Sequence, residues 1–517
     1  MAHQNDGVDI LPRSDNGSIN VDKKDTELAH NLNEVVYKPA NTQLNDPLGW
    51  GQKFQCFEPD VPEKTTDTLS MYLAAFTADL VAFCAGIGFS WTSPVLPKLH
   101  EADSPLGAPI NASQESIIAA ILCLGAAIGP FPYGSMSDRK GRKLTVIMVA
   151  IPIAIAFAIL AFATDIRLYY LARLINGFAI GGCFAVLTMY IAEISNDSNR
   201  GKFSCLLGLF IASGVLYPFI VGPYMSIKTL CLSCLAPLAL FLVLFTFYNP
   251  ESPVYLTKIG DRNAAEEALM KLRSRPREGV EKEYLQIQKT IEISGNEQGG
   301  CGLLFKTRGF RKGFVVSAGL LVIQQLSGIN AVTGYLQNIF SAAGGAIPPE
   351  YGAVLVGLIQ VATMGITSSV IERLGRKLLL LMSDLGCGVS IILLGLYFFL
   401  QRMQFSLLPY FWWLPIVCLV VYIISFNLGL GPVSWTVLSE VFPSNIKSFA
   451  SALASAITFG TSFVITIGFP IISEAIGMAE TFWLLGACCL AGFAFTYLVV
   501  PETKGRTLTE IQEILSK

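Results

Sequence analysis

The chain has 517 residues, of which 52% are hydrophobic and only 14% are charged, and its formal net charge at pH 7 is −2. Soluble domains usually carry about a quarter charged residues, so this composition excludes a soluble globular protein and indicates one that crosses a membrane many times. The small net charge gives no reason to expect nucleic acid as a partner.

The first 69 residues are polar and do not open with the charged-then-apolar pattern of a signal peptide, so we expect residues 1–69 to form a largely disordered cytoplasmic tail. About twelve apolar stretches of spanning length follow. They predict an all-α membrane protein built from two pseudo-symmetric six-helix bundles. The predicted segments are an N-terminal bundle at 70–248, a cytoplasmic linker with short helices at 249–312, a C-terminal bundle at 313–500 and a cytoplasmic tail at 501–517.

Lys and Arg residues concentrate in one set of short loops and in the linker, which predicts that both termini and the linker lie in the cytoplasm. The sequon at Asn111 falls in the first loop on the opposite side and is a candidate glycosylation site, whereas a second sequon at Asn196 falls on the cytoplasmic side. Within the linker, Asp261–Arg273 has an N-cap candidate and helix-forming composition. We interpret this segment as a solvated amphipathic helix, with calmodulin or lipid binding as the alternative.

Three short motifs occur once within or directly after each predicted bundle, always at a cytoplasmic helix end. They are S-D-R-K-G-R-K and I-E-R-L-G-R-K, Y-I-A-E-I-S and V-L-S-E-V-F, and P-E-S and P-E-T. The order of the pairs indicates duplicated halves, which place a substrate between them near the bilayer midplane. Because acidic and basic residues meet at one level, we predict that they latch the cytoplasmic side shut, although the basic residues could merely set topology. The predicted latch comprises Asp138, Arg139, Arg142, Glu193, Arg200, Glu372, Arg373, Arg376, Glu440 and Lys447.

The stretch from Leu321 to Phe340, L-V-I-Q-Q-L-S-G-I-N-A-V-T-G-Y-L-Q-N-I-F, is long and apolar enough to span a membrane, yet it carries several amides and two glycines. On a regular helix Gln325 and Asn330 point roughly 140° apart, so they could not meet at one small ligand. A break near Gly328 or Gly334 would allow them to meet, and broken helices mark substrate sites in transporters. The other interpretation is that the amides only hold helices together.

The sequence offers little for catalysis or metal binding. Most of the 12 cysteines lie in apolar stretches, Cys231-x-x-Cys234 has no second pair, and the three histidines lie apart from any carboxylate cluster. We therefore predict no metal, no cofactor and no enzymatic activity.

Several motifs resemble the sugar-porter branch of the major facilitator superfamily, of the facilitative glucose transporter type. In chain order they are D-R-K-G-R, R-L-I-N-G-F-A-I-G-G, P-E-S-P-V-Y-L, Q-Q-L-S-G-I-N-A-V, E-R-L-G-R-K, G-P-V-S-W and P-E-T-K-G-R-T-L, and they cover residues 70–512. The first helix, with F-S-W-T-S-P-V-L at 89–96, is similar to that of insect facilitated trehalose transporters.

The resemblance implies a role for each matching position. Gln324, Gln325, Asn330 and Gln360 would hydrogen-bond sugar hydroxyls, and Trp435 would stack on the sugar ring. Tyr335 and Thr333 would line the extracellular gate.

The chain also departs from the family pattern, which leaves the site more complete in the C-terminal half than in the N-terminal half and weakens any expectation of glucose itself. Positions that are polar or proline in the family are occupied in this chain by Gly208, Thr188, Ser434, Asn427, Thr458 and Val254. A position that is usually aromatic in the family is occupied by Thr333.

We therefore predict facilitative transport of a neutral sugar, a hexose or a trehalose-like disaccharide, across the plasma membrane by alternating access. The sugar and the lipid bilayer are the expected partners, and a monomer is the expected working unit. One alternative is proton-coupled symport, for which Asp79 is the only acid in the first helix, although the helix centre at Ile87–Thr92 has none. A second alternative is a non-transporting sugar sensor, which the short segment after Pro501 disfavours.

Overall fold

The computed structural model describes residues 68–102, 104–196, 200–295, 308–442, 444–504, 506, 510–511 and 514–515. The predicted tail at 1–69 thus lies almost entirely outside the described residues. The side chains of Arg200, Glu372 and Lys447, all members of the predicted latch, also lie outside them.

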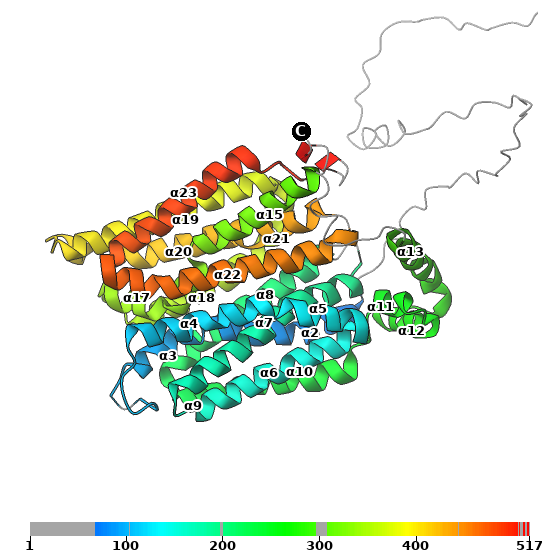
Figure 1. Cartoon of the computed structure of the whole chain (residues 1–517), viewed down its shortest axis with the longest axis horizontal. Helices are drawn as coiled ribbons and strands as arrows, with labels where there is room; N and C mark the ends of the chain where they lie inside the picture. The colour runs from blue at the N-terminus through cyan, green and yellow to red at the C-terminus, as the bar shows by residue number, and fades with distance from the viewer. Residues whose placement is uncertain are drawn as a thin grey trace, which may run out of the picture. The chain divides into compact units, whose positions relative to one another are not determined.

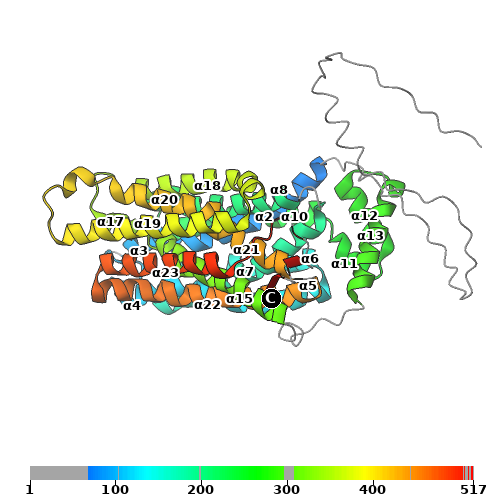
Figure 2. The same cartoon turned by 90° about the horizontal axis from the view of Figure 1, so that it is seen from above.

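Every regular element in the described part of the chain is a helix, and twelve segments are long and apolar enough to span a membrane. They run roughly parallel in Figures 1 and 2, and we call Leu69–Tyr248 the N-terminal half and Arg308–Val499 the C-terminal half. The helices of the N-terminal half are α2 (Leu69–Ser90), α3 (Thr92–Leu99), α4 (Ala112–Ile128), α5 (Pro130–Lys140), α6 (Arg142–Phe162), α7 (Ile166–Ile194), α8 (Arg200–Val221), η1 (Gly222–Tyr224), α9 (Ile227–Ser233) and α10 (Leu235–Tyr248). Those of the C-terminal half are α15 (Arg308–Leu326), α16 (Ile329–Gly334), α17 (Leu336–Ala343), α18 (Pro349–Leu374), α19 (Arg376–Arg402), η2 (Leu408–Phe411), α20 (Leu414–Leu428), α21 (Leu430–Val441), α22 (Ser444–Ile476) and α23 (Met478–Val499).

Three short helices, α11 (Pro253–Lys258), α12 (Arg262–Arg273) and α13 (Arg277–Gly295), pack together at one end of the spans, which we call the linker end; the opposite end is the distal end (Figures 1 and 2). The sequence predicted short helices here. Arg273 fixes α12 to the N-terminal half, because its Nη1 donates to the carbonyl of Ile194 at 2.8 Å and its Nη2 pairs with Glu283 at 2.7 Å.

Glycine permits the closest helix contacts within the N-terminal half. A Cβ atom added at Gly177 of α7 would lie 1.9 Å from the carbonyl oxygen of Leu122 in α4, and one at Gly181 would lie 2.3 Å from that of Ala126. These positions form a small-xxx-small pattern, which lets helix backbones touch where lipid offers no hydrophobic driving force. The α4–α7 pair is therefore held by direct backbone contact.

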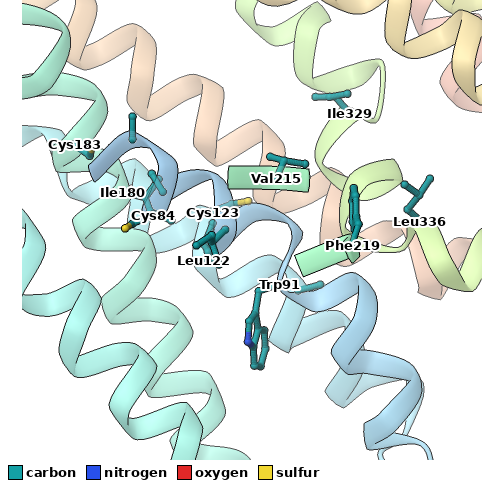
Figure 3. Packing of buried hydrophobic residues seen from close by; sticks show 14 of the residues in the cluster. Cys84, Trp91, Leu122, Cys123, Ile180, Cys183, Val215, Phe219, Ile329 and Leu336 are labelled. Atoms are coloured by element: carbon teal, nitrogen blue, oxygen red, sulfur yellow. The ribbon is translucent and has the colours of Figure 1, made fainter. Parts of the chain in front are cut away.

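The two halves pack on each other through α4 with α22 and through α8 with α18. One buried hydrophobic cluster joins the N-terminal half to the distal part of the C-terminal half; its members in Figure 3 include Trp91, Leu122 and Cys123 of the first and Ile329 and Leu336 of the second. A separate cluster around Val316, Val437 and Phe442 belongs to the linker end of the C-terminal half alone. The apolar core thus bridges the halves chiefly at the distal end.

Candidate functional site

The span that begins at Arg308 is broken twice. The α-helix α15 ends at Leu326, Gly328 adopts a left-handed conformation with φ 87°, and the chain resumes as α16 and then, after Tyr335, as α17. Gly328 tolerates this φ because it has no Cβ, and an added Cβ would also lie 2.8 Å from Leu485 Cδ1. The predicted break near Gly328 is confirmed.

The break brings together the two amides that a straight helix would separate. Asn330 Nδ2 donates to Gln325 Oε1 at 2.8 Å and to Ser462 Oγ of α22 at 2.6 Å. Gln325 Nε2 in turn donates to Gln324 Oε1 at 3.3 Å. Ser462 also contacts Cys123 Sγ of α4 at 3.2 Å, so this polar network reaches the boundary between the halves.

Sequence reasoning missed Ser462, although a signal was present. Ser455, Thr458, Ser462 and Thr466 recur at helical spacing along one face of α22, and all four are buried. Such a polar face in a membrane span must meet other polar groups, and here Asn330 is one of them.

Gln324 differs from its neighbour, because its amide nitrogen is fully used by the protein. Nε2 donates to the carbonyls of Leu430 at 2.9 Å and Gly431 at 2.8 Å, where the span formed by α20 and α21 is interrupted at Gly429. The N–H group of Leu430 donates to Ser383 Oγ at 2.9 Å. The bonds made by Gln324 fit the interpretation that this amide holds helices together. Asn330 differs, because it is only half-buried and its Oδ1 remains available.

Gln360 and Trp435 are half-buried and hydrogen-bond no other described residue, so their polar atoms are free to meet a ligand. At its boundary with α22 the N-terminal half presents aromatic rings. Phe184 of α7 lies 6.1 Å from Phe89 and 6.0 Å from Phe459 of α22, measured between ring centroids. The candidate site therefore combines an amide-rich wall from the C-terminal half with a mainly apolar wall from the N-terminal half.

The predicted gate residues Tyr335 and Thr333 are both buried, at 2% and 8% exposure, toward the distal end. The Tyr335 ring stacks on Phe469 with centroids 5.6 Å apart, and its hydroxyl has no hydrogen-bond partner in the described structure. The backbone N–H of Gln337 donates to Ser93 Oγ of the N-terminal half at 3.2 Å. In this conformation α16 and α17 therefore close against α2 and α3.

Known proteins resemble this chain over most of its length. Residues 62–515 match the family described as sugar (and other) transporter. The chain belongs to this sugar transporter family. It is 30% identical to the facilitated trehalose transporter Tret1 of Bombyx mori over 463 residues, which cover 88% of this chain and 89% of that protein. The Tret1 protein of Culex quinquefasciatus is 30% identical over 449 residues, 86% of each chain.

Solved structures show the same fold. The proton:xylose symporter XylE bound to 6-bromo-6-deoxy-D-glucose superposes with a TM-score of 0.71 at 22% identity, over 87% of this chain and 100% of that one. An inward-open conformation of the E. coli xylose transporter XylE gives a TM-score of 0.69 at 22% identity, over 86% and 99% of the two chains. The predicted major facilitator fold of two six-helix halves is confirmed.

The repeated motifs of this sugar transporter chain build two matching clusters at the linker end. In the N-terminal half Arg142 pairs with Glu193 at 3.0 Å, and Glu251 Oε1 accepts from the N–H of Arg142 at 2.9 Å. Ser252 Oγ donates to Glu193. The Arg142 side chain also donates to Asp138 at 3.4 Å, whereas the Arg139 side chain is exposed.

In the C-terminal half Arg376 pairs with Glu440 at 2.8 Å, and Thr503 Oγ1 donates to Glu440 at 2.6 Å. Glu502 accepts from the N–H groups of Arg376 and Lys377, both at 3.0 Å, at the start of α19. Although burial opposes ionisation, hydrogen bonds from the backbone N–H groups of Lys504, Arg376 and Lys377 hold the pKa of Glu502 below its usual value.

Each of these two ion pairs lies within one half, so what the structure shows is a tie between helices of the same half. The Arg373 side chain is exposed. A latch between the halves stays a prediction. Three of its predicted members, Arg200, Glu372 and Lys447, have side chains outside the described residues.

We predict that Gln324→Leu lowers thermal stability, because it removes the two hydrogen bonds by which α15 is tied to the carbonyls of Leu430 and Gly431. A hydrogen bond within a protein contributes roughly 0.5–1.5 kcal/mol to stability. Gln360→Leu is the matched control, since this amide makes no hydrogen bond to another described residue and its loss should leave stability unchanged. Melting temperatures from fluorescence-detected size exclusion of the purified variants measure both. Equal melting temperatures for the two variants would contradict the assigned role of Gln324.

Proposed function

We propose that this protein is a facilitative carrier that moves a neutral sugar across the plasma membrane by alternating access. The observation that carries the proposal is the meeting of Gln325 and Asn330 at the break, next to the boundary between the halves. Amides donate and accept hydrogen bonds, as sugar hydroxyls do, and a broken helix is the usual place for a transporter's substrate. Gln360 and Trp435 complete the proposed site.

The proposed substrate is a hexose or a trehalose-like disaccharide. Support for the disaccharide comes from the relatives at 30% identity, which are named as trehalose transporters. The aromatic wall of Phe89, Phe184 and Phe459 suits the apolar faces of sugar rings. At the position of Gly208, where a polar side chain of the N-terminal half was expected, Met364 of the C-terminal half lies close instead, since its Cε would be 3.2 Å from an added Cβ.

Uniport is supported by the surroundings of Arg173, a fully buried cation of α7. Its Nη1 donates to the carbonyl of Gly88 at 2.6 Å, its Nε donates to that of Ile118 at 3.1 Å, and the guanidinium lies 5.5 Å from the Trp91 ring centroid. Backbone carbonyls and an aromatic ring thus stabilise the positive charge of Arg173. No titrating carboxylate is needed to pair with it. Asp79 lies nine residues before Gly88, roughly 13 Å along the helix.

Proton symport remains the second candidate, because Asp79 is fully buried and its carboxylate oxygens have no hydrogen-bond partner among the described residues. The structural neighbour XylE is itself named a proton:xylose symporter.

We also propose that the linker end faces the cytoplasm and that Asn111, at the distal end, carries an N-glycan outside the cell. Asn111 is exposed, and its side-chain oxygen caps α4 by accepting from the N–H of Gln114 at 2.8 Å, which leaves the amide nitrogen for a glycan. The proposed working unit is a monomer, since one chain supplies both walls of the site.

Uptake of a labelled panel of hexoses and disaccharides into oocytes tests the proposed function. Saturable uptake of at least one sugar, inhibited by unlabelled sugar, is the expected result. Surface-expressed protein that moves none of the panel would overturn it.

Gln325→Leu and Asn330→Leu should each lower apparent sugar affinity roughly 5- to 150-fold, because bound hydroxyls would lose partners worth about 1–3 kcal/mol. Surface-normalised uptake at varied sugar concentration measures this, with Gln288→Leu in the exposed face of α13 as the matched amide control. If the amides only tie helices together, delivery to the surface should fall while affinity in the delivered protein stays normal.

For a uniporter, uptake should be nearly independent of external pH between about 5.5 and 7.5 and insensitive to a protonophore. Electrical recording during sugar application checks this. Sugar-induced proton currents that disappear in Asp79→Asn would replace uniport by symport.

The proposed orientation of the protein in the membrane can be tested through its glycosylation. Endoglycosidase treatment should shift the wild-type band, and Asn111→Gln should abolish the shift while Asn196→Gln preserves it. A shift that depends on Asn196 would place the linker end outside the cell.

A further inference from the structure

A buried carboxylate at the distal end bridges the two halves. Glu115 lies in the first turn of α4 in the N-terminal half and is only 8% exposed. Its Oε1 accepts from Asn338 Nδ2 of α17, in the C-terminal half, at 2.7 Å. Its Oε2 lies 3.0 Å from His100 Nε2, just after α3. Both oxygens are therefore engaged, one of them across the boundary.

The contact belongs to α17, the last helix of the broken span. Asn338 is the third residue of α17, and the preceding residue, Gln337, is tied to the N-terminal half through Ser93. Two consecutive residues of α17 thus bind the opposite half, within one turn of buried Tyr335. Any opening of the distal end that parts α17 from α4 must break the Glu115–Asn338 bond.

A carboxylate in the first turn of a helix has an ordinary explanation, since it favours the positive end of the helix dipole. An interaction with the helix dipole does not require that the carboxylate be buried or that it bind a residue of the opposite half. Here the cap of α4 is already provided by Asn111 and Gln114, which bond each other's backbone N–H groups. The local needs of α4 are met without Glu115, which leaves its bond to Asn338 to be explained.

We propose that Glu115 is the positioning residue through which the N-terminal half holds α17 in the closed position, with His100 orienting the carboxylate. Hydrogen bonds to a charged group are stronger than neutral ones, and water can replace this one only when the halves part. The bond therefore sets the balance between the closed and open forms of the distal end. The proposal rests on the alternating access proposed above, but it does not depend on which sugar is carried.

The experiment measures the distance between the halves without any substrate. Cysteines at Ala108 and Ala346, exposed positions on the distal loops of the two halves, carry spin labels in a background free of reactive native cysteines. Double electron–electron resonance on the full chain in nanodiscs should show mainly one short distance. Glu115→Ala and Asn338→Ala should each raise the population at longer distance relative to the short one, on the order of tenfold.

The pair also predicts how combined variants behave. The double variant Glu115→Ala with Asn338→Ala should open no further than either single variant, because both remove the same bond. Asn338→Asp alone should open the distal end more, since it sets two carboxylates together. Adding Glu115→Gln to Asn338→Asp restores an amide donor facing a carboxylate with the roles exchanged, and should recover the short distance.

Glu101→Gln is the matched control, because it removes an exposed carboxylate from the same loop and should leave the distances unchanged. Unchanged distances in Glu115→Ala and Asn338→Ala would overturn the proposal. If Glu115→Ala fails to fold, Asn338→Ala and the exchanged pair still decide it, and the absence of recovery in the exchanged pair would count against it. A failed uptake panel would refute the proposed function while leaving these distances as they are.

Discussion

The site depends on one constraint: a helix that breaks inside a membrane must find new partners for the backbone groups it exposes. Two spans of the C-terminal half break close to each other, at Gly328 and at Gly429, and each donates side-chain hydrogen bonds to backbone carbonyls of the other. Gln324, four residues before Gly328, donates to the carbonyls next to Gly429. Tyr422, on the second span, donates its hydroxyl to the carbonyl of Ser327 at 3.0 Å. These bonds therefore tie the two breaks to each other.

This mutual support has a functional consequence for the neighbouring side chains. Because Gln324 is used for the framework, Gln325 and Asn330 are held at fixed positions beside it without having to carry the framework themselves. A substrate site gains precision when its side chains are anchored by a second layer of hydrogen bonds. The family resemblance assigned Gln324 and Gln325 the same role, but their contacts differ. Gln324 anchors the second span, whereas Gln325 is the candidate sugar-binding residue.

Much of the fold could be predicted from the sequence, because span length, hydropathy and repeated motifs are local properties. The break at Gly328 was also predictable, since amides that point apart on a straight helix are costly in hydrocarbon. The partners of these groups were not predictable. Ser462 lies far along the chain from Asn330, and Glu115 lies far from Asn338, and only the packing of α22 and α17 brings them together. The same limit applies to Arg142 and Arg376, whose charges suggested contacts between the halves although their partners lie within each half.

The two halves are duplicates in topology, yet they have diverged in chemistry at the site. At the linker end they keep matching clusters, in which Glu251 and Glu502 each accept from the first N–H groups of a spanning helix. In the middle, the C-terminal half offers amides and the N-terminal half offers the ring of Phe184. Hydrogen bonds have strict geometry, whereas an apolar ring can slide over a sugar face with little change in energy. Under the proposed function, the sugar stays hydrogen-bonded to the C-terminal half while the N-terminal half moves, so the proposal assigns binding and movement to different halves.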